Sequence, residues 1–180
     1  MRYCNVNAAK SIVLIGMMGA GKSSVGRCLQ RRTGLARIDI DETVATEFGM
    51  PIAQIFEKHS EQKFRDAETE ALRKLAPDRP VIIVTGGGIV SRPENVDLLK
   101  KLGTIVWLTA DEETLFERAS RRNDRPLLQK ENPRNIFAEL FGKRDPLYAA
   151  VADFQINTST KTHDEVAETI LNKLEELSAL

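Results

Sequence analysis

The sequence predicts an α/β domain built on a mostly parallel sheet. Three observations predict it. Short apolar runs alternate with helical patterns along the 180 residues. The middle runs are rich in Ile and Val and nearly continuous, as expected of strands that are buried on both faces. The composition, 42% hydrophobic and 29% charged, is ordinary for one globular domain.

The expected strands come first. They are the apolar runs at 12–15, 36–38, 81–84, 105–108 and 154–156. Helices are expected where apolar residues recur at i, i+3 and i+4. These patterns cover 25–32, 64–75, 115–119, 134–148 and 166–177. No repeat or linker interrupts the pattern, so residues 1–180 are expected to form a single domain.

Two stretches depart from the strand-helix rhythm. Residues 41–70 read as a long helical insertion, broken at Gly49-Met50-Pro51. Residues 119–133 are polar and contain two prolines. Long excursions in compact α/β domains are often lids or binding loops, so both are candidates for ligand contact.

The overall charge and the cysteine count exclude several classes of function. Lys plus Arg and Asp plus Glu are both 26, so no global field attracts nucleic acid or an anionic membrane. Two cysteines with no metal spacing favour a reducing, cytoplasmic location over a disulfide scaffold. An apolar run at 12–21 imitates a signal peptide, but it ends in Gly-Lys-Ser, and no run is long enough to span a membrane.

Residues 16–23, Gly-Met-Met-Gly-Ala-Gly-Lys-Ser, match the phosphate-binding pattern GxxxxGK[ST] between an expected strand and an expected helix. The glycines let backbone N–H groups turn toward a phosphate at a helix N-terminus. Lys22 is expected to bridge the β- and γ-phosphates of a nucleotide, and Ser23 to hold Mg²⁺. The alternative is a glycine-rich turn by chance. The expected nucleotide-binding residues here are Gly19, Ala20, Gly21, Lys22, Ser23 and Ser24.

A carboxylate for Mg²⁺ is expected at the end of a neighbouring strand. The run at 81–84 ends in Thr-Gly-Gly-Gly without an acid, so Asp39 and Asp41 are the candidates. In an extended chain these two share a face; one would organise the metal and the other would accept or fix a hydroxyl proton. The alternative is that Asp41 caps the following helix.

Three consecutive glycines at 86–88 suggest backbone pressed against a ligand, or alternatively a tight turn.

Arg144 lies on the same face as Phe137 and Tyr148, and an arginine on an apolar stripe needs an anionic ligand or an internal salt bridge. Arg65 and Glu68 are three residues apart on an expected helix. From the residues alone they are either a surface ion pair or part of a functional site.

Residues 118–134 carry six basic and two acidic side chains in a chain of zero net charge. A basic loop suits closure over a triphosphate. Nucleic acid is the less favoured interpretation because the segment holds no aromatic residue for base stacking. A nucleotide switch is excluded as well, since no Asp is followed by Gly three residues later.

Together, these motifs resemble the shikimate kinase family over about residues 11–175. They are GMMGAGKSSVGR at 16–27, DID at 39–41, FRDAE at 64–68, GGG at 86–88, RPLL at 125–128 and KRDPLY at 143–148. The resemblance implies ATP- and Mg²⁺-dependent phosphorylation of the 3-hydroxyl of shikimate, on the pathway to chorismate and aromatic amino acids. It also implies a P-loop fold of the nucleoside-monophosphate-kinase type, with a five-stranded parallel sheet in the order 2-3-1-4-5, and usually a monomer.

The resemblance further implies roles for individual residues. Residues 41–70 become the shikimate-binding region and 119–133 the lid. Lys22, Asp41 and Arg125 become catalytic, and Ser23 and Asp39 the magnesium ligands. Arg118 and Asn157 join the ATP site. The shikimate-binding positions are Asp41, Arg65, Gly86, Gly87, Gly88 and Arg144.

One position departs from the family pattern: Ser60 stands where the family often has glycine. Gluconate kinases, which share the scaffold but lack the set of Asp41, FRxxE and Arg144, are the alternative family. A non-catalytic binding module is a further alternative, against which stands the occupation of every expected catalytic position.

Overall fold

The computed structural model of the chain describes residues 10–121 and 131–179. Five parallel strands form one sheet in the order β2-β3-β1-β4-β5, which confirms the predicted order. Every predicted strand is present, within one or two residues of its expected ends. The strands are β1 (Ser11–Ile15), β2 (Arg37–Asp39), β3 (Ile82–Val84), β4 (Gly103–Thr109) and β5 (Phe154–Asn157).

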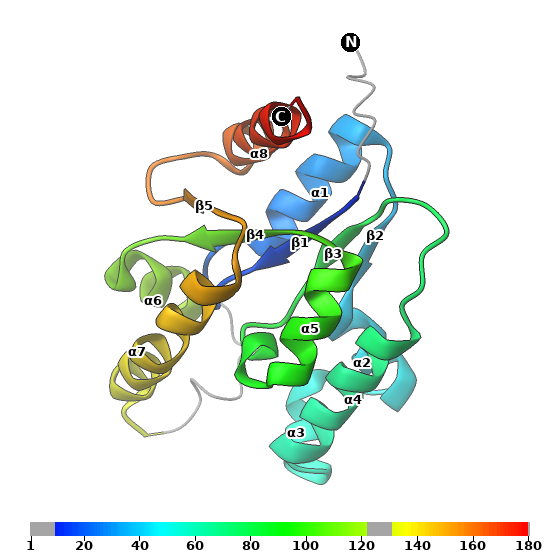
Figure 1. The fold of residues 1–180 in the computed structure, drawn as a ribbon. Coiled ribbons are helices and arrows are strands. Elements are labelled where there is room, and N and C mark those ends of the chain that lie inside the picture. The colour runs from blue at the N-terminus through cyan, green and yellow to red at the C-terminus, as the bar shows by residue number, and fades with distance from the viewer. Residues whose placement is uncertain (1–9, 122–130, 180) are drawn as a thin grey trace.

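Helices cover both faces of the sheet (Figure 1). One face carries α1 (Lys22–Thr33) and α8 (His163–Ser178), which pack on each other. The other carries α5 (Pro93–Leu102) and α7 (Pro133–Val151), with α6 (Glu112–Ser120) beside α7. Beyond β2 lie α2 (Ile40–Phe48), α3 (Ile52–Lys58) and α4 (Glu61–Lys74), which pack on one another and form the insertion at 41–70.

The central strand β1 is completely buried, because it has a strand on each side and a helical layer over each face. Each fully buried Ile or Leu there contributes about 1.5–3 kcal/mol relative to an exposed one. This buried core holds the strands in place, and with them the edge of the sheet at which their carboxyl ends lie. None of the helices in the described ranges is long and apolar enough to cross a membrane.

Helix α5 was not predicted from the sequence, because one of its core-facing positions is a polar residue. Asn95 is buried and donates from Nδ2 to the carbonyl of Ile89, in the 3-10 turn η1 (Ile89–Ser91), at 3.1 Å. The apolar stripe expected to face the core on the last helix, over 166–177, is also longer than the buried stretch of that helix. Leu177 is half exposed, since the last buried residue of α8 is Leu171.

Three segments leave the carboxyl edge of the sheet side by side. β1 runs into the glycine-rich loop, β2 ends at Asp39, and β3 runs into the triple glycine at 86–88. Because ligands of open parallel sheets bind at this edge, the fold places the phosphate loop, the aspartates and the triple glycine around one crevice.

Candidate active site

The phosphate loop takes a conformation that requires glycine. Gly16 and Gly19 have φ values of 139° and 88°. A Cβ at Gly16 would lie 2.3 Å from the carbonyl oxygen of Leu108, and one at Gly19 would lie 2.2 Å from that of Leu115. The loop therefore packs directly on β4 and α6, and it delivers the chain to the first turn of α1 at Lys22.

Lys22 lies under this loop. Its side chain is largely buried, and Nζ donates to the carbonyls of Gly16 at 2.7 Å and Met17 at 3.0 Å. The cation is thereby held within the phosphate loop, at the N-terminal end of α1, where the helix dipole also favours anions. Ala20 is buried inside the turn and lines neither of the two cavities described below.

The first cavity, of about 330 Å³, opens beside the phosphate loop. Its wall on α6 includes Arg118, whose guanidinium donates to Thr158 Oγ1 at 3.1 Å and to the carbonyls of Thr158 and Ser159, both at 3.0 Å. Asn157 does not line this cavity. Its Oδ1 accepts from the N–H of Ser159 at 2.8 Å, so it shapes the loop that holds Arg118.

His163 also lines this cavity, and sequence reasoning missed it. Its ring packs against Gly21, where a Cβ would lie 3.1 Å from the imidazole. Burial lowers the pKa of His163, and Arg118 and Arg27 lower it further, which favours the neutral imidazole. The residue stands at the start of a helix distant in sequence from the loop, and no motif marked it.

The second cavity, of about 340 Å³, lies between the sheet edge and the insertion. It brings together Arg65, Gly86–Gly88 and Arg144, three predicted elements from distant parts of the chain. Asp39 and Asp41 line it as well. The two cavities share Ser23, Asp41 and Gly87, so a ligand in one adjoins a ligand in the other at these residues.

Arg65 and Glu68 form an ion pair at 2.5 Å, but not at the surface. Glu68 is fully buried, and Arg65 also reaches the exposed Glu61 at 3.0 Å. Burial raises the pKa of Glu68 to about 7, with Asp41 adding to the rise and Arg65 opposing it. The buried carboxylate fixes the guanidinium against the cavity.

Arg144 is buried to 6% exposure, and no acidic side chain in residues 10–121 and 131–179 lies within ion-pair distance. The internal salt bridge that the sequence left open is therefore absent from this part of the chain. Burial lowers the pKa of Arg144. A buried cation without a paired anion is costly, so this guanidinium is placed to receive an anionic ligand.

The triple glycine is packed against these side chains. A Cβ at Gly88 would lie 2.4 Å from the guanidinium of Arg65, and one at Gly86 would lie 2.6 Å from carboxylate oxygens of Asp41 and Glu68. The segment is a tight turn, since Ile89 N donates to the Gly86 carbonyl, and the close approach calls for glycine at Gly86 and Gly88. A Cβ at Gly87 would make only ordinary contacts, the nearest at 3.4 Å.

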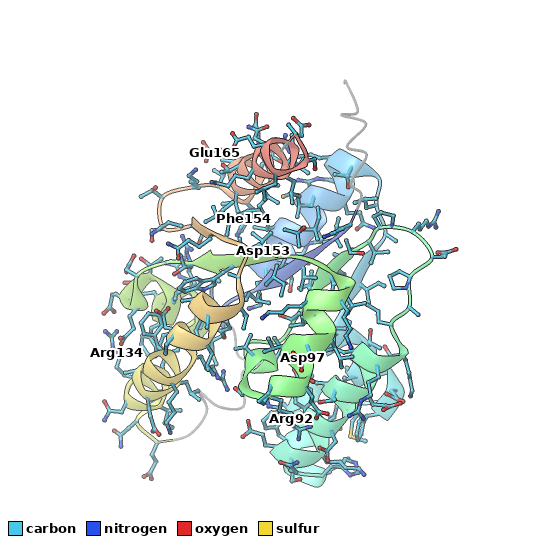
Figure 2. The ribbon with its side chains drawn as sticks, viewed as in Figure 1. Arg92, Asp97, Arg134, Asp153, Phe154 and Glu165 are labelled. Carbon is cyan, nitrogen blue, oxygen red and sulfur yellow. The ribbon has the colours of Figure 1, made fainter. Side chains whose placement is uncertain are left out.

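Arg92 ties the end of this turn to the helix that carries Arg65. Its Nη2 donates to Asp66 at 2.7 Å and its Nη1 to Thr69 Oγ1 at 3.1 Å. Figure 2 labels Arg92 at the start of α5, near α4. The glycine turn and α4 are thereby held in one arrangement.

The expectation that Asp39 and Asp41 lie two apart in an extended chain is wrong. The strand ends at Asp39 and α2 begins at Ile40, so Asp41 sits in the first turn of a helix. Asp41 is not the cap either, since Asp39 holds that position and makes no side-chain capping bond. Both aspartates nevertheless line the second cavity, because the strand ends at its wall.

Asp39 is the better placed of the two for a cation near the phosphate loop. Its Oδ2 accepts from Ser23 Oγ at 3.3 Å and from Arg37 Nη1 at 3.0 Å. Oxygen donors of this kind suit Mg²⁺, which needs only one or two protein ligands beside substrate phosphates. Across the described ranges, no group of three or more His, Cys, Asp or Glu gathers into a metal-binding cluster.

Arg125 and most of the expected lid, including the RPLL segment, lie outside the described residues. Glu68 and Tyr148 belong to segments that the sequence marked, FRDAE and KRDPLY, but they received no role there. Both side chains are buried, and burial is the feature that marks them as functional candidates. Only the folded structure shows it.

The phosphate loop, the sheet order and the paired cavities define a P-loop kinase with the fold of the nucleoside-monophosphate kinases. Comparison with known proteins gives the family. The shikimate kinase family model matches residues 18–175. A shikimate kinase from Thermodesulfovibrio yellowstonii is 47% identical over 169 residues, covering 94% of this chain and 97% of that protein. The chain belongs to the shikimate kinase family.

Solved structures agree. A shikimate kinase from Acinetobacter baumannii in complex with shikimate has a TM-score of 0.88 and 37% identity, covering 93% of each chain. A gluconokinase from Sinorhizobium meliloti has a TM-score of 0.59 and 22% identity over 93% of each chain, which shows the shared fold alone.

Proposed function

We propose that the chain transfers the γ-phosphoryl group of ATP to the 3-hydroxyl of shikimate, giving shikimate 3-phosphate and ADP. The observation that carries this is the pair of cavities that meet at Ser23, Asp41 and Gly87. One is built on a phosphate loop and the other on two buried arginines. A donor and an acceptor held there would be neighbours, so orientation supplies much of the catalysis.

ATP binds the first cavity in this proposal. The backbone N–H groups of Gly19 and Gly21 face its phosphates, and Ser24 lines the same wall. The N–H of Ala20 donates to the Met17 carbonyl at 3.2 Å, so Ala20 shapes the phosphate loop. Lys22 moves from the loop carbonyls to the transferring phosphoryl oxygens. Arg118, fixed by the loop after β5, supports the adenine with Asn157 behind it. Arg125 and the lid at 119–133 remain predicted partners of the γ-phosphate.

Ser23 and Asp39 would hold the Mg²⁺, whose chemistry is to neutralise charge on the β- and γ-phosphate oxygens. The hydrogen bond of 3.3 Å from Ser23 Oγ to Asp39 Oδ2 supports this assignment, because it brings the two oxygens together beside the phosphate loop. Arg37 Nη1 donates to the same Oδ2 at 3.0 Å and so helps to hold the Asp39 carboxylate in that orientation.

Shikimate binds the second cavity. Arg65 and Arg144 hold its carboxylate, which offsets the cost of burying Arg144, for which residues 10–121 and 131–179 supply no ion-pair partner. The N–H groups of Gly86, Gly87 and Gly88 face its ring oxygens. Asp41, shared by both cavities, holds the reacting hydroxyl and accepts its proton.

The test is ADP release with ATP and Mg²⁺, comparing shikimate, gluconate and no acceptor. Release that depends on shikimate alone supports the proposal. Release with gluconate and not with shikimate would move the chain to the alternative substrate. Nucleotide binding without release for any acceptor would favour a binding module.

Arg65→Ala gives a sharper test of the acceptor site. We expect it to raise KM for shikimate at least tenfold while KM for ATP stays within twofold. Arg73→Ala is the matched control, because Arg73 lies on the same helix and its exposed side chain pairs with Glu94. Equal losses for both substrates would contradict the assignment of Arg65.

We also propose a monomer in the cytoplasm. Leu147 and Leu177 are the large hydrophobic side chains exposed in the described ranges, and they lie on different helices. Two cysteines, of which Cys28 is buried and unpaired, suit a reducing compartment. Light scattering coupled to gel filtration measures the oligomeric state.

A further inference from the structure

Tyr148 is the last residue of the KRDPLY segment, and the proposed function gives it no role. Its ring is almost completely buried and lies 6.0 Å from Trp107 between centroids. Its hydroxyl donates to the carbonyl of Gly87 and lies 3.9 Å from Met17 Sδ. Burial raises the pKa of the phenol, so it remains a hydrogen-bond donor across the physiological range.

The bond to Gly87 completes a pattern in the triple glycine. All three carbonyls have donors: Ile89 N for Gly86, the Tyr148 hydroxyl for Gly87, and Ser91 N for Gly88. The N–H groups of the three glycines have no acceptor within residues 10–121 and 131–179. All three glycines line the second cavity. The turn thus engages its acceptors within the protein and leaves its donors for a ligand.

Peptide geometry links the phenol to those donors. No peptide bond in the described chain is cis, and in a trans peptide the C=O and the following N–H point in opposite directions. Because Tyr148 holds the Gly87 carbonyl on the buried side, the N–H of Gly88 points away from the core. Loss of the phenol hydroxyl frees this peptide plane to rotate, which glycine permits more than any other residue.

Tyr148 also sets the spacing of the site. It lies four residues after Arg144, so both side chains leave the same face of α7. Nη1 of Arg144 would lie 3.7 Å from a Cβ at Gly87. One turn of one helix therefore fixes the acceptor-site arginine and the acceptor-site peptide relative to each other.

We propose that Tyr148 is a positioning residue for the acceptor: its hydroxyl holds the Gly87 carbonyl and thereby aims the Gly88 N–H at bound shikimate, in register with Arg144. The proposal rests on the proposed function of the second cavity. Tyr148 does not line that cavity and acts through the backbone.

The test is Tyr148→Phe, which removes the hydroxyl and keeps the ring on Trp107. We expect KM for shikimate to rise about tenfold, as for loss of one well-oriented buried hydrogen bond, while KM for ATP stays within twofold. Ser11→Ala is the matched control. Its hydroxyl accepts from the Val81 N–H at 3.1 Å, at the opposite end of the sheet, so this variant loses a buried side-chain-to-backbone bond without touching the site.

The outcomes separate cleanly. If both KM values of Tyr148→Phe stay unchanged, or rise in parallel, the positioning role is overturned. The same holds if Ser11→Ala shows the same split between substrates. If the unmodified chain releases no ADP with shikimate, the proposed function fails and this proposal fails with it.

A second measurement tests the proposal on the unmodified residue, in case Tyr148→Phe does not fold. The chain has two tyrosines, so 3-fluorotyrosine labelling gives two fluorine signals, and Tyr3→Phe assigns them. Donation from Gly88 to a ligand polarises the Gly87 carbonyl and strengthens the bond from Tyr148. The Tyr148 signal is therefore expected to shift at saturating shikimate. A signal that does not move would overturn the proposal.

Discussion

Glu68→Gln tests the electrostatics of the second cavity, which Glu68 lines, through protein stability. Glu68 is fully buried against Arg65 and near Asp41, and its pKa in the folded chain is about 7, against an ordinary value of 4.5. Burial is the main cause, and Arg65 offsets only part of it. The carboxyl group is thus held protonated more readily in the folded chain than in the unfolded one.

The sign and the magnitude follow from linkage. Between pH 4.5 and about 7 the folded state binds more protons at Glu68 than the unfolded state does, so this contribution to stability is present at low pH and is lost as pH rises. The two pKa values are about 2.5 pH units apart, and each unit corresponds to about 1.4 kcal/mol. The full loss is therefore about 3–4 kcal/mol, of which about 3 kcal/mol falls between pH 4.5 and pH 8.

The assay is urea unfolding of both chains from pH 4.5 to pH 8. Relative to Glu68→Gln, the unmodified chain should lose about 3 kcal/mol across this window. Glu61→Gln is the control, because Glu61 is the exposed partner of the same Arg65, and exposed pairs contribute less than about 1 kcal/mol. Parallel stability profiles for the unmodified chain and Glu68→Gln would refute the reasoning.

Three further substitutions have expected outcomes. Ser60→Gly should raise the free energy of unfolding by about 1 kcal/mol in urea, because Ser60 has φ 99° and its capping bond from Lys63 N is long, at 3.4 Å. Gly88→Ala places a Cβ 2.4 Å from the Arg65 guanidinium, which must move by about 1 Å, so steady-state kinetics should show a KM for shikimate at least tenfold higher and an unchanged KM for ATP. Arg144→Met should remove shikimate binding in calorimetry while raising the unfolding midpoint, since it replaces a buried cation that has no ion-pair partner among the described residues with an apolar side chain.

The sequence predicted all five strands, but it missed helix α5 and extended the apolar stripe of the last helix too far. Strands β1, β3 and β4 were legible because burial on both faces makes them continuously apolar. Helix α5 was missed because Asn95 occupies a core position that hydrogen bonding, rather than apolarity, satisfies. The prediction that Asp39 and Asp41 share one face of an extended chain was wrong, because the boundary between strand and helix falls between them.

Ser60 shows how a sequence departure acquires a physical meaning. Its position, where the family often has glycine, was visible in the sequence. The structure gives it a positive φ at the start of α4, a conformation that glycine adopts freely and serine does not. The departure therefore concerns backbone strain at the start of the helix that carries Arg65, and Ser60 itself does not line the second cavity.

By itself, the sequence determined the phosphate loop, the parallel sheet and the family resemblance, because these depend on local spacing and on hydrophobic runs. The tertiary structure decided which polar groups are buried together. Glu68 pairs with Arg65 on its own helix, but its complete burial depends on the segments packed around that helix. The burial of Arg144, with no ion-pair partner among the described residues, and the bond from Tyr148 to the Gly87 carbonyl likewise depend on segments far apart in the chain. Desolvation and peptide orientation arise only when those segments pack, and no local pattern encodes them.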